Sequence, residues 1–302
     1  MNIKRYLILL SMVFSTPLWA QINIFACEPE WAALAVELGG EHVKVFSATM
    51  GLQDPHKIQP RPSLMAKARQ ADMIVCTGAD LEVGWLPLLL RQVGNPRIQP
   101  DQPGYFIATD YVKLKEIPVH VNRLNGDVHA MGNPHIQTNP YNIGVVAKAL
   151  AQRFQQVDPE HASSYQTRYT AFKKRWDAAI EQWNIKAKPL HGTPIIVSHN
   201  SWIYMEDWLD LKRVTTLEPK PGIPASSGYL ADVLKQTQEQ EVDMIINAAY
   251  QDPRAADWLE DRSDITIVTL PFTVGGDTHA TDLFSLFDRT IALLLEAKKN
   301  ES

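Results

Sequence analysis

Residues 159–187 read PEHASSYQTRYTAFKKRWDAAIEQWNIKA, and this stretch decides the architecture of the chain. Its apolar residues recur at steps of four, three, four, three and four: Tyr165, Tyr169, Phe172, Trp176, Ala179 and Trp183. This spacing, with a period of about 3.6 residues, predicts one long helix with a single apolar face. We interpret the aromatic side chains as core packing, so other elements have to cover this face. Pro189 and Gly192 end the segment.

Short β-branched runs alternate with helical stretches on both sides of this helix. Before it, we expect strands at 22–26, 43–46 and 73–75, and helices at 31–38, 63–70, 81–92 and from Asn139-Pro140 onward. After it, we expect strands at 195–198, 214–217, 244–247 and 265–270, and helices at 202–208, 229–240, 254–262 and 282–297. Such alternation predicts mostly parallel sheets that are covered by helices on both faces.

The expected fold is therefore α/β, with two lobes joined by one long backbone helix and a binding site in the cleft between them. We place the lobes at 21–156 and 189–302 and the linking helix at 157–188. The chain has 302 residues, of which 45% are hydrophobic, and a formal net charge of -5. This composition excludes a disordered chain, and the lack of a basic excess argues against a nucleic-acid partner.

The first 20 residues have the pattern of a secretory signal peptide. Lys4-Arg5 precede an apolar run at 6–14 and the small-residue stretch that ends at Ala20. We expect cleavage after Ala20, and no cysteine follows the cut to carry a lipid. Export would place Cys27 and Cys76 in an oxidising compartment. Both residues stand at the ends of expected strands, so a disulfide, two buried thiols and zinc ligation all stay open.

Three of the nine histidines lie in loops that hold the backbone tightly. They are His56 in QDPH (53–56), His135 in GNPH (132–135) and His199 in IIVSHN (195–200). A proline before the first two restricts the backbone, and the third follows an expected strand. Three imidazoles and one oxygen donor suit four-coordinate zinc. The spacing alone establishes no more than a candidate metal site.

These motifs, together with ADMIV (71–75), TGADLE (77–82) and LEPKPG (217–222), resemble the ZnuA/TroA-like metal-binding solute-binding proteins of ABC importers. The resemblance covers essentially the whole chain after the leader, in the same order. It implies two α/β lobes bridged by a single long helix. Its first three metal-binding positions fall on His56, His135 and His199. Histidine at the third position implies zinc, because manganese members tend to carry glutamate there.

The resemblance leaves the fourth ligand open. The family often has an aspartate in the loop after the last strand, which here reads PFTVGGDTH (271–279), and the family position falls near Thr273 or Val274. Neither side chain is a good ligand, so we take Asp277 as the expected fourth ligand. The alternatives are His279, Asp282 and a water molecule.

Three other residues lie near the expected site. His129 precedes the second ligand and is a lesser candidate for metal capture, in a chain that lacks the long histidine- and acid-rich loop of enteric zinc members. Glu28 either enters the cleft or complements the start of a helix. Trp202 either lines the site or packs in the core.

The resemblance implies a periplasmic receptor that captures Zn²⁺ and delivers it to an inner-membrane ABC permease. We expect a monomer, and a zinc metallochaperone as a further partner. One alternative is an Mn²⁺ or Fe²⁺ receptor of the same family, and another is an adhesin of the same fold. A secreted zinc hydrolase would need Glu28 or Glu218 as its base, and the chain carries neither H-E-x-x-H nor G-x-S-x-G, so we expect no enzyme.

Overall fold

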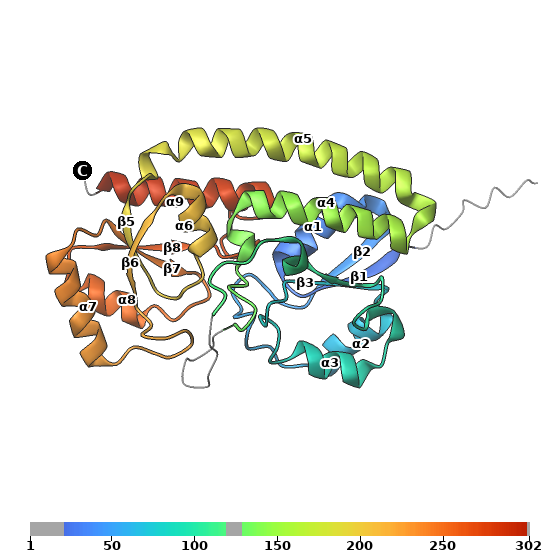
Figure 1. Ribbon diagram of the computed structural model, residues 1–302, viewed down its shortest axis with the longest axis horizontal. Coiled ribbons are helices and arrows are strands. Elements are labelled where there is room, and N and C mark those ends of the chain that lie inside the picture. Colours follow the sequence, from blue (N-terminus) through green and yellow to red (C-terminus); the bar gives the residue numbers. More distant parts are fainter. Residues whose placement is uncertain (1–20, 119–128, 301–302) are drawn as a thin grey trace, which may run out of the picture.

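The computed structural model describes residues 21–118 and 129–300, and it has the predicted α/β fold with two sheets (Figure 1). The signal peptide predicted for 1–20 lies outside the described residues. Each sheet has four parallel strands. In the first sheet, with the order β2-β1-β3-β4, the strands are β1 (Ile22–Ala26), β2 (Val43–Ser47), β3 (Met73–Cys76) and β4 (Tyr105–Ile107). In the second, with the order β6-β5-β7-β8, they are β5 (Pro194–Val197), β6 (Lys212–Thr216), β7 (Met244–Ala248) and β8 (Thr266–Leu270).

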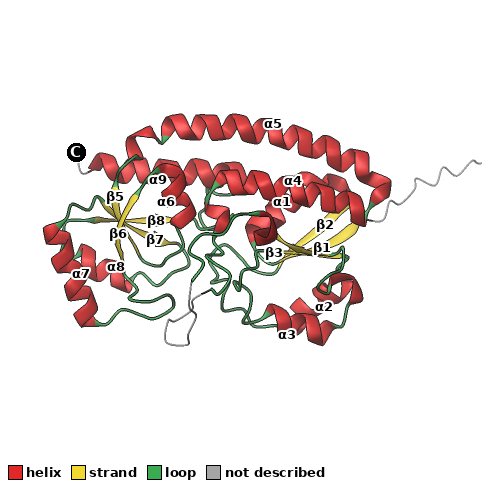
Figure 2. Ribbon diagram, viewed as in Figure 1, coloured by secondary structure: helices red, strands yellow, loops and turns green. Residues whose placement is uncertain are grey.

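Helices cover both faces of each sheet, and the long α5 (Ala162–Lys186) runs over both lobes (Figures 1 and 2). The helices of the first lobe are α1 (Pro29–Gly39), α2 (Pro62–Gln70), α3 (Leu86–Val93) and α4 (Pro140–Val157). Those of the second lobe are α6 (Ile203–Leu209), α7 (Ser227–Glu239), α8 (Arg254–Glu260) and α9 (Leu283–Asn300). As expected, Asn139 caps α4: its side chain accepts a hydrogen bond from Tyr141 N at 2.9 Å.

Most of the aromatic stripe of α5 is buried, as predicted, and Tyr169 is partly buried. Tyr165, Phe172, Trp176 and Trp183 are each at most 2% exposed. Trp176 packs edge-on against Phe284 of α9 at 4.9 Å between ring centroids, and its Nε1 donates to Pro140 O at 2.9 Å. The core around this stripe is continuous and includes side chains from both sheets. On this side of the molecule the lobes therefore share one hydrophobic core.

On the opposite face, each lobe has a core of its own. In the first lobe, the sheet residue Ile74 packs with Leu89 of α3. In the second lobe, Ile245 packs with Leu259 of α8. The sharing of a core is thus confined to the α5 side.

Two expectations for the first lobe were wrong. The helix expected at 81–92 begins only at Leu86, because Pro87 has no N–H and fits only in the first helical turn. The strand β4 was missed: it has only three residues and follows a polar, proline-rich stretch that masks any alternating pattern.

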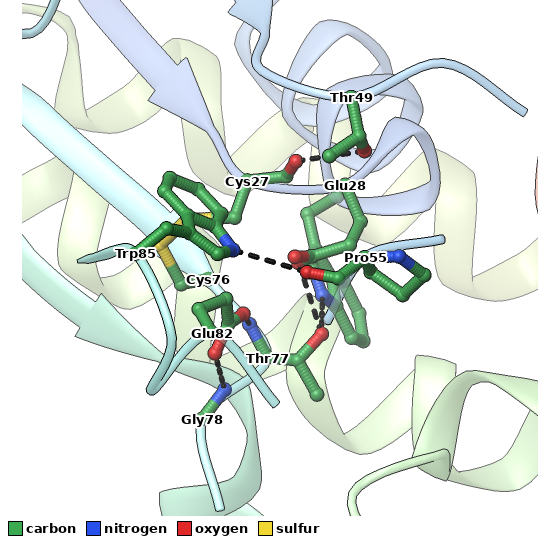
Figure 3. Close-up of a disulfide and its surroundings, with 10 residues drawn as sticks. Cys27, Glu28, Thr49, Pro55, Cys76, Thr77, Gly78, Glu82 and Trp85 are labelled. Atoms are coloured by element: carbon green, nitrogen blue, oxygen red, sulfur yellow. Dashed lines mark hydrogen bonds between the residues drawn. A yellow bond between two sulfur atoms is a disulfide. The ribbon is translucent and has the colours of Figure 1, made fainter. Parts of the chain in front are cut away.

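Cys27 and Cys76 form a disulfide (Figure 3). They end neighbouring parallel strands, since β1 pairs with β3, and both side chains are fully buried. Of the three alternatives open at the level of the sequence, the structure has the disulfide.

The two lobes also meet at a point where no side chain fits. A Cβ atom added to Gly51, in the loop after β2, would lie 2.2 Å from the carbonyl carbon of Gly275 and 2.4 Å from Gly276 N. The close approach of these backbones, one from each lobe, therefore requires glycine at position 51.

Candidate metal centre

The three histidines predicted as ligands come together in loops of the two lobes. The ring centroids lie 5.5 Å apart for His56 and His135, 6.1 Å for His56 and His199, and 5.8 Å for His135 and His199. His56 and His135 come from the first lobe, and His199 follows β5 of the second. The site thus lies between the lobes, as the fold predicts.

His129 joins this cluster. Its Nε2 lies 3.4 Å from Nε2 of His56, and its ring centroid lies 6.0 Å from that of His135. One ring nitrogen from each of His56, His129 and His135 lies within 4.8 Å of the others. A single ion in this space can be reached by several imidazoles.

His56 is held in place by a carboxylate and by its own loop. Asp54 Oδ1 accepts hydrogen bonds from Nδ1 of His56 at 2.8 Å and from its backbone N at 3.0 Å. Burial alone would raise the pKa of Asp54, but these hydrogen bonds lower it to about 2. The ionised carboxylate can only accept, so it favours the neutral tautomer of His56 with the proton on Nδ1, which leaves the lone pair of Nε2 for a metal ion. Trp85 Nε1 fixes the loop by donating to Pro55 O at 3.0 Å (Figure 3).

His199 has a similar partner in the second lobe. Its Nδ1 lies 2.6 Å from Oε2 of Glu218, which also accepts a hydrogen bond from Gly222 N at 2.9 Å. Such carboxylate–histidine pairs orient the ring and strengthen the other nitrogen as a metal ligand. Each lobe therefore supplies one imidazole that is supported by a carboxylate.

His135 is buried at the back of the cluster, 1% exposed, with its ring 5.4 Å from that of Phe272. Among the residues that the structure describes, its Nδ1 has no hydrogen-bond partner. Burial, followed by the neighbouring His56, lowers the pKa of His135 well below its usual value. The same causes lower the pKa of His129 to about 3. Both imidazoles are thus neutral at pH 7 and free to bind a metal through a lone pair.

The carboxylates considered for the fourth position lie in other local contacts. Asp277 accepts hydrogen bonds from Nε of Arg289 at 3.0 Å and from His279 N at 2.7 Å, and the latter bond in particular lowers its pKa to about 2. The His279 side chain is 74% exposed. Asp282 accepts a hydrogen bond from Ser285 N at 2.7 Å at the start of α9.

The other residues near the expected site belong to buried contacts. Glu28 is 3% exposed and accepts a hydrogen bond from the hydroxyl of Thr77 at 3.0 Å (Figure 3). Burial raises the pKa of Glu28 well above its usual value. The hydroxyl of Thr273 donates to Glu30 of α1 and so joins the two lobes. Trp202 is 2% exposed and packs edge-on against Phe272, as expected for a core residue.

Sequence reasoning did not assign the carboxylate partners of His56 and His199. Asp54 had a local signal, since an aspartate two residues before a histidine can accept from its backbone and its ring. Glu218 had none, because 19 residues separate it from His199 and only the parallel pairing of β5 with β6 brings them together.

The relatives found by comparison with known proteins are components of metal importers. The sequence model of the ZnuA family, described as the periplasmic component A of the zinc-uptake complex, matches residues 24–297. The metal ABC transporter substrate-binding lipoprotein SloC of Streptococcus mutans is 22% identical over 84% of this chain and 81% of its own length. The manganese ABC transporter substrate-binding lipoprotein PsaA of Streptococcus pneumoniae is 22% identical over 80% of this chain and 76% of its own length.

A solved structure agrees with the fold. The crystal structure of ZnuA superposes with a TM-score of 0.76 at 19% identity, over 93% of this chain and 100% of that one. None of the helices within the described ranges combines the length and the apolar character that a bilayer crossing requires. Because the family model spans nearly the whole chain, the chain belongs to the ZnuA family of metal-binding substrate-binding components of ABC importers.

Proposed function

We propose that this protein captures Zn²⁺ with four imidazoles, those of His56, His129, His135 and His199, and delivers the ion to an ABC permease. The observation that carries the proposal is the convergence of these rings between the lobes. His129 takes the fourth position in place of Asp277, whose carboxylate is engaged by Arg289. Four protein ligands complete the tetrahedral arrangement that zinc prefers in closed sites.

The chemistry of the donors favours zinc over manganese. Neutral imidazole suits zinc and the late first-row metals, whereas Mn²⁺ favours carboxylate, carbonyl and water oxygens. The two carboxylates nearest the rings, on Asp54 and Glu218, each face an imidazole Nδ1 and so act on the ligands rather than on the ion. The name of the pneumococcal relative refers to manganese, and the imidazole set is the reason to propose zinc here.

The same set argues against the secreted hydrolase. Catalytic zinc sites keep one position open for water, and four imidazoles fill the tetrahedron. Glu218, one candidate for the base, is hydrogen-bonded to His199, and Glu28 is bound to Thr77 in the interior. A closed site suits capture and release.

Isothermal titration of the apo protein with Zn²⁺, Mn²⁺ and Fe²⁺ tests the metal. We expect Zn²⁺ to bind at least 100-fold more tightly than Mn²⁺, and Mn²⁺ binding as tightly as Zn²⁺ would refute the zinc assignment. His129→Ala and Asp277→Ala test the fourth ligand. His129→Ala should lower Zn²⁺ affinity at least tenfold, while Asp277→Ala and the exposed control His279→Ala should match the unsubstituted protein. The opposite result would return Asp277 to the site.

We propose further that the protein acts in the periplasm after removal of residues 1–20, as a monomer. The Cys27–Cys76 disulfide supports this place, because such bonds persist in oxidising compartments. The partners we propose are the inner-membrane permease and a zinc metallochaperone. Release of the protein by osmotic shock, at the mass of the chain without residues 1–20, tests the export. Retention of the full-length product with the cell membranes would contradict it.

A further inference from the structure

The two histidine motifs each carry an asparagine whose role the metal site does not explain. Asn133 stands two residues before His135, and Asn200 directly follows His199. Asn133 Oδ1 accepts a hydrogen bond from His135 N at 3.1 Å, and its Nδ2 donates to Asn200 O at 2.8 Å. One buried side chain, 6% exposed, therefore ties the backbone of one metal-binding loop to that of the other across the lobes.

Two charged residues close this contact. Glu116, from the first lobe, accepts a hydrogen bond from Asn200 Nδ2 at 2.6 Å and lies 3.2 Å from the guanidinium of Arg213 in β6. Arg213 also donates to Asn200 Oδ1 and lies 3.3 Å from Glu206 of α6. The side-chain oxygen of Asn200 is thus bound by Arg213 of the second lobe, and its side-chain nitrogen is bound by Glu116 of the first lobe. We call Glu116, Asn133, Asn200 and Arg213 the interlobe clamp.

The backbone conformation of Glu116 indicates that its contacts hold this residue in one position. Its φ of 52° lies in the left-handed region, which residues with a Cβ atom seldom occupy. A residue keeps such a conformation when surrounding contacts determine it. Here the contacts are those of the carboxylate with Asn200, Arg213 and Asn133 Nδ2, the last at 3.3 Å.

We infer that the interlobe clamp sets the spacing of His135 and His199 and thereby the rate at which the metal leaves. The inference rests on the proposed function, since it concerns the same metal site. A tetrahedral ion needs each nitrogen at about 2.0–2.1 Å, so a shift of a few tenths of an ångström in one loop weakens the bond that its histidine makes to the ion. The clamp residues are positioning residues: they fix the loops, while the imidazoles bind the ion. Loss of the clamp frees the loops to separate and lets the ion go.

The variants Arg213→Met and Glu116→Gln remove the charged contact, and Lys115→Met is the matched control. Lys115 Nζ pairs with Asp207 of α6 at 2.9 Å, so its side chain joins the same two lobes beside the clamp. Within the described part of the chain, Lys115 is hydrogen-bonded to the clamp only through its backbone carbonyl, which accepts from Asn133 N at 2.8 Å and is kept in Lys115→Met. Glu116 is 36% exposed, so Glu116→Gln is expected to fold even if Arg213→Met does not.

Two readouts separate positioning from general stability: the rate of Zn²⁺ loss to a chelator, and the visible absorption spectrum of the protein saturated with Co²⁺, a metal of similar ligand preference. We expect both clamp variants to lose Zn²⁺ about tenfold faster or more, the range of outer-shell partners, and to shift the Co²⁺ bands. Lys115→Met should change neither. The inference would be overturned if the unsubstituted protein binds zinc and the clamp variants have the same Co²⁺ spectrum and the same rate of Zn²⁺ loss as Lys115→Met. An unsubstituted protein that binds neither metal would refute the proposed function as well.

Discussion

The lobes of this protein meet in two regions of opposite character. Beneath α5 they share one continuous apolar core, in which Trp176 packs against residues of α9. On the side of the cleft they meet through polar contacts: the four histidines, the interlobe clamp, and the hydrogen bond from Thr273 to Glu30. Both regions join residues far apart in the chain, but they use different forces.

The difference separates two properties of the molecule. Hydrophobic burial is non-directional and scales with area, so the core beneath α5 contributes mainly to the free energy of unfolding. Hydrogen bonds and metal–ligand bonds depend on direction, so we expect the cleft to contribute mainly to the affinity for the proposed metal ion. Substitutions in one region should therefore leave the property of the other region nearly unchanged, and the following predictions test that separation.

The largest effect is expected from Trp176→Ala. Its side chain is 1% exposed and contacts α4 and α9, so the substitution leaves a cavity that costs roughly 3–5 kcal/mol of unfolding free energy. Urea denaturation of the apo protein measures this cost, and Zn²⁺ titration of the folded variant should give the original affinity. A large loss of affinity at full folding would show that the core also shapes the site.

Removal of the disulfide comes next. Cys27 and Cys76 are 49 residues apart, and a crosslink of this kind contributes typically about 2–4 kcal/mol by restricting the unfolded chain. The double variant C27A/C76A should lose that amount in the same denaturation assay. Its Zn²⁺ affinity should be retained, because the sulfur atoms lie in the core of the first lobe rather than among the rings. Equal stability with and without the bond would contradict the prediction.

Glu30 should give a pH-dependent effect. Burial raises its pKa from 4.5 to about 7, so the folded state holds a proton that the unfolded state releases. The stability from this group is complete below pH 4.5 and is lost as the pH rises through 7, by roughly 2 kcal/mol between pH 5 and 7. Glu30→Gln should flatten this part of the stability profile in denaturation series at each pH. An unchanged slope would assign the pH dependence to other groups.

The smallest effect is expected for the carboxylates that bind two of the proposed ligands. Asp54→Asn and Glu218→Gln keep an oxygen acceptor and remove the charge that supports His56 and His199. Because both side chains are 28% exposed, solvent weakens their influence, and we expect a loss of Zn²⁺ affinity of about tenfold each, the lower end of the usual range. Competition titration measures it, and Asp277→Asn serves as the control. The free energy of unfolding of the apo variants should barely change. A marked destabilisation would show that the cleft also contributes to the stability of the fold.

Local patterns predicted most of the fold. The steps of three and four in α5 and the β-branched runs are periodic signals within one segment, and the structure contains the elements that they predict. Strand β4 was not predicted, because three residues are too few to show an alternating pattern of apolar and polar side chains. The start of α3 depended on Pro87, whose position in the first turn is a better guide than the apolar residues before it.

The site could be predicted only in part, because its members come from distant segments. Motifs in loops pointed to His56, His135 and His199, and the fold brings those rings together. The sequence around His129 does not predict where its side chain points, because the residue lies in a loop outside any helix or strand. Its approach to His56 is a result of tertiary packing alone. The same is true of Glu218 and of the clamp, whose contacts join segments up to 97 residues apart.

The shared core beneath α5 also limits how the molecule can open. Separating the lobes by a hinge motion would expose part of that core. Exposing about 200 Å² of apolar surface would cost about 5 kcal/mol at the usual coefficient. Thermal motion alone would then open only about one molecule in several thousand. We therefore expect the lobes to stay together beneath α5 and a bound ion to leave through rearrangement of the loops at the cleft.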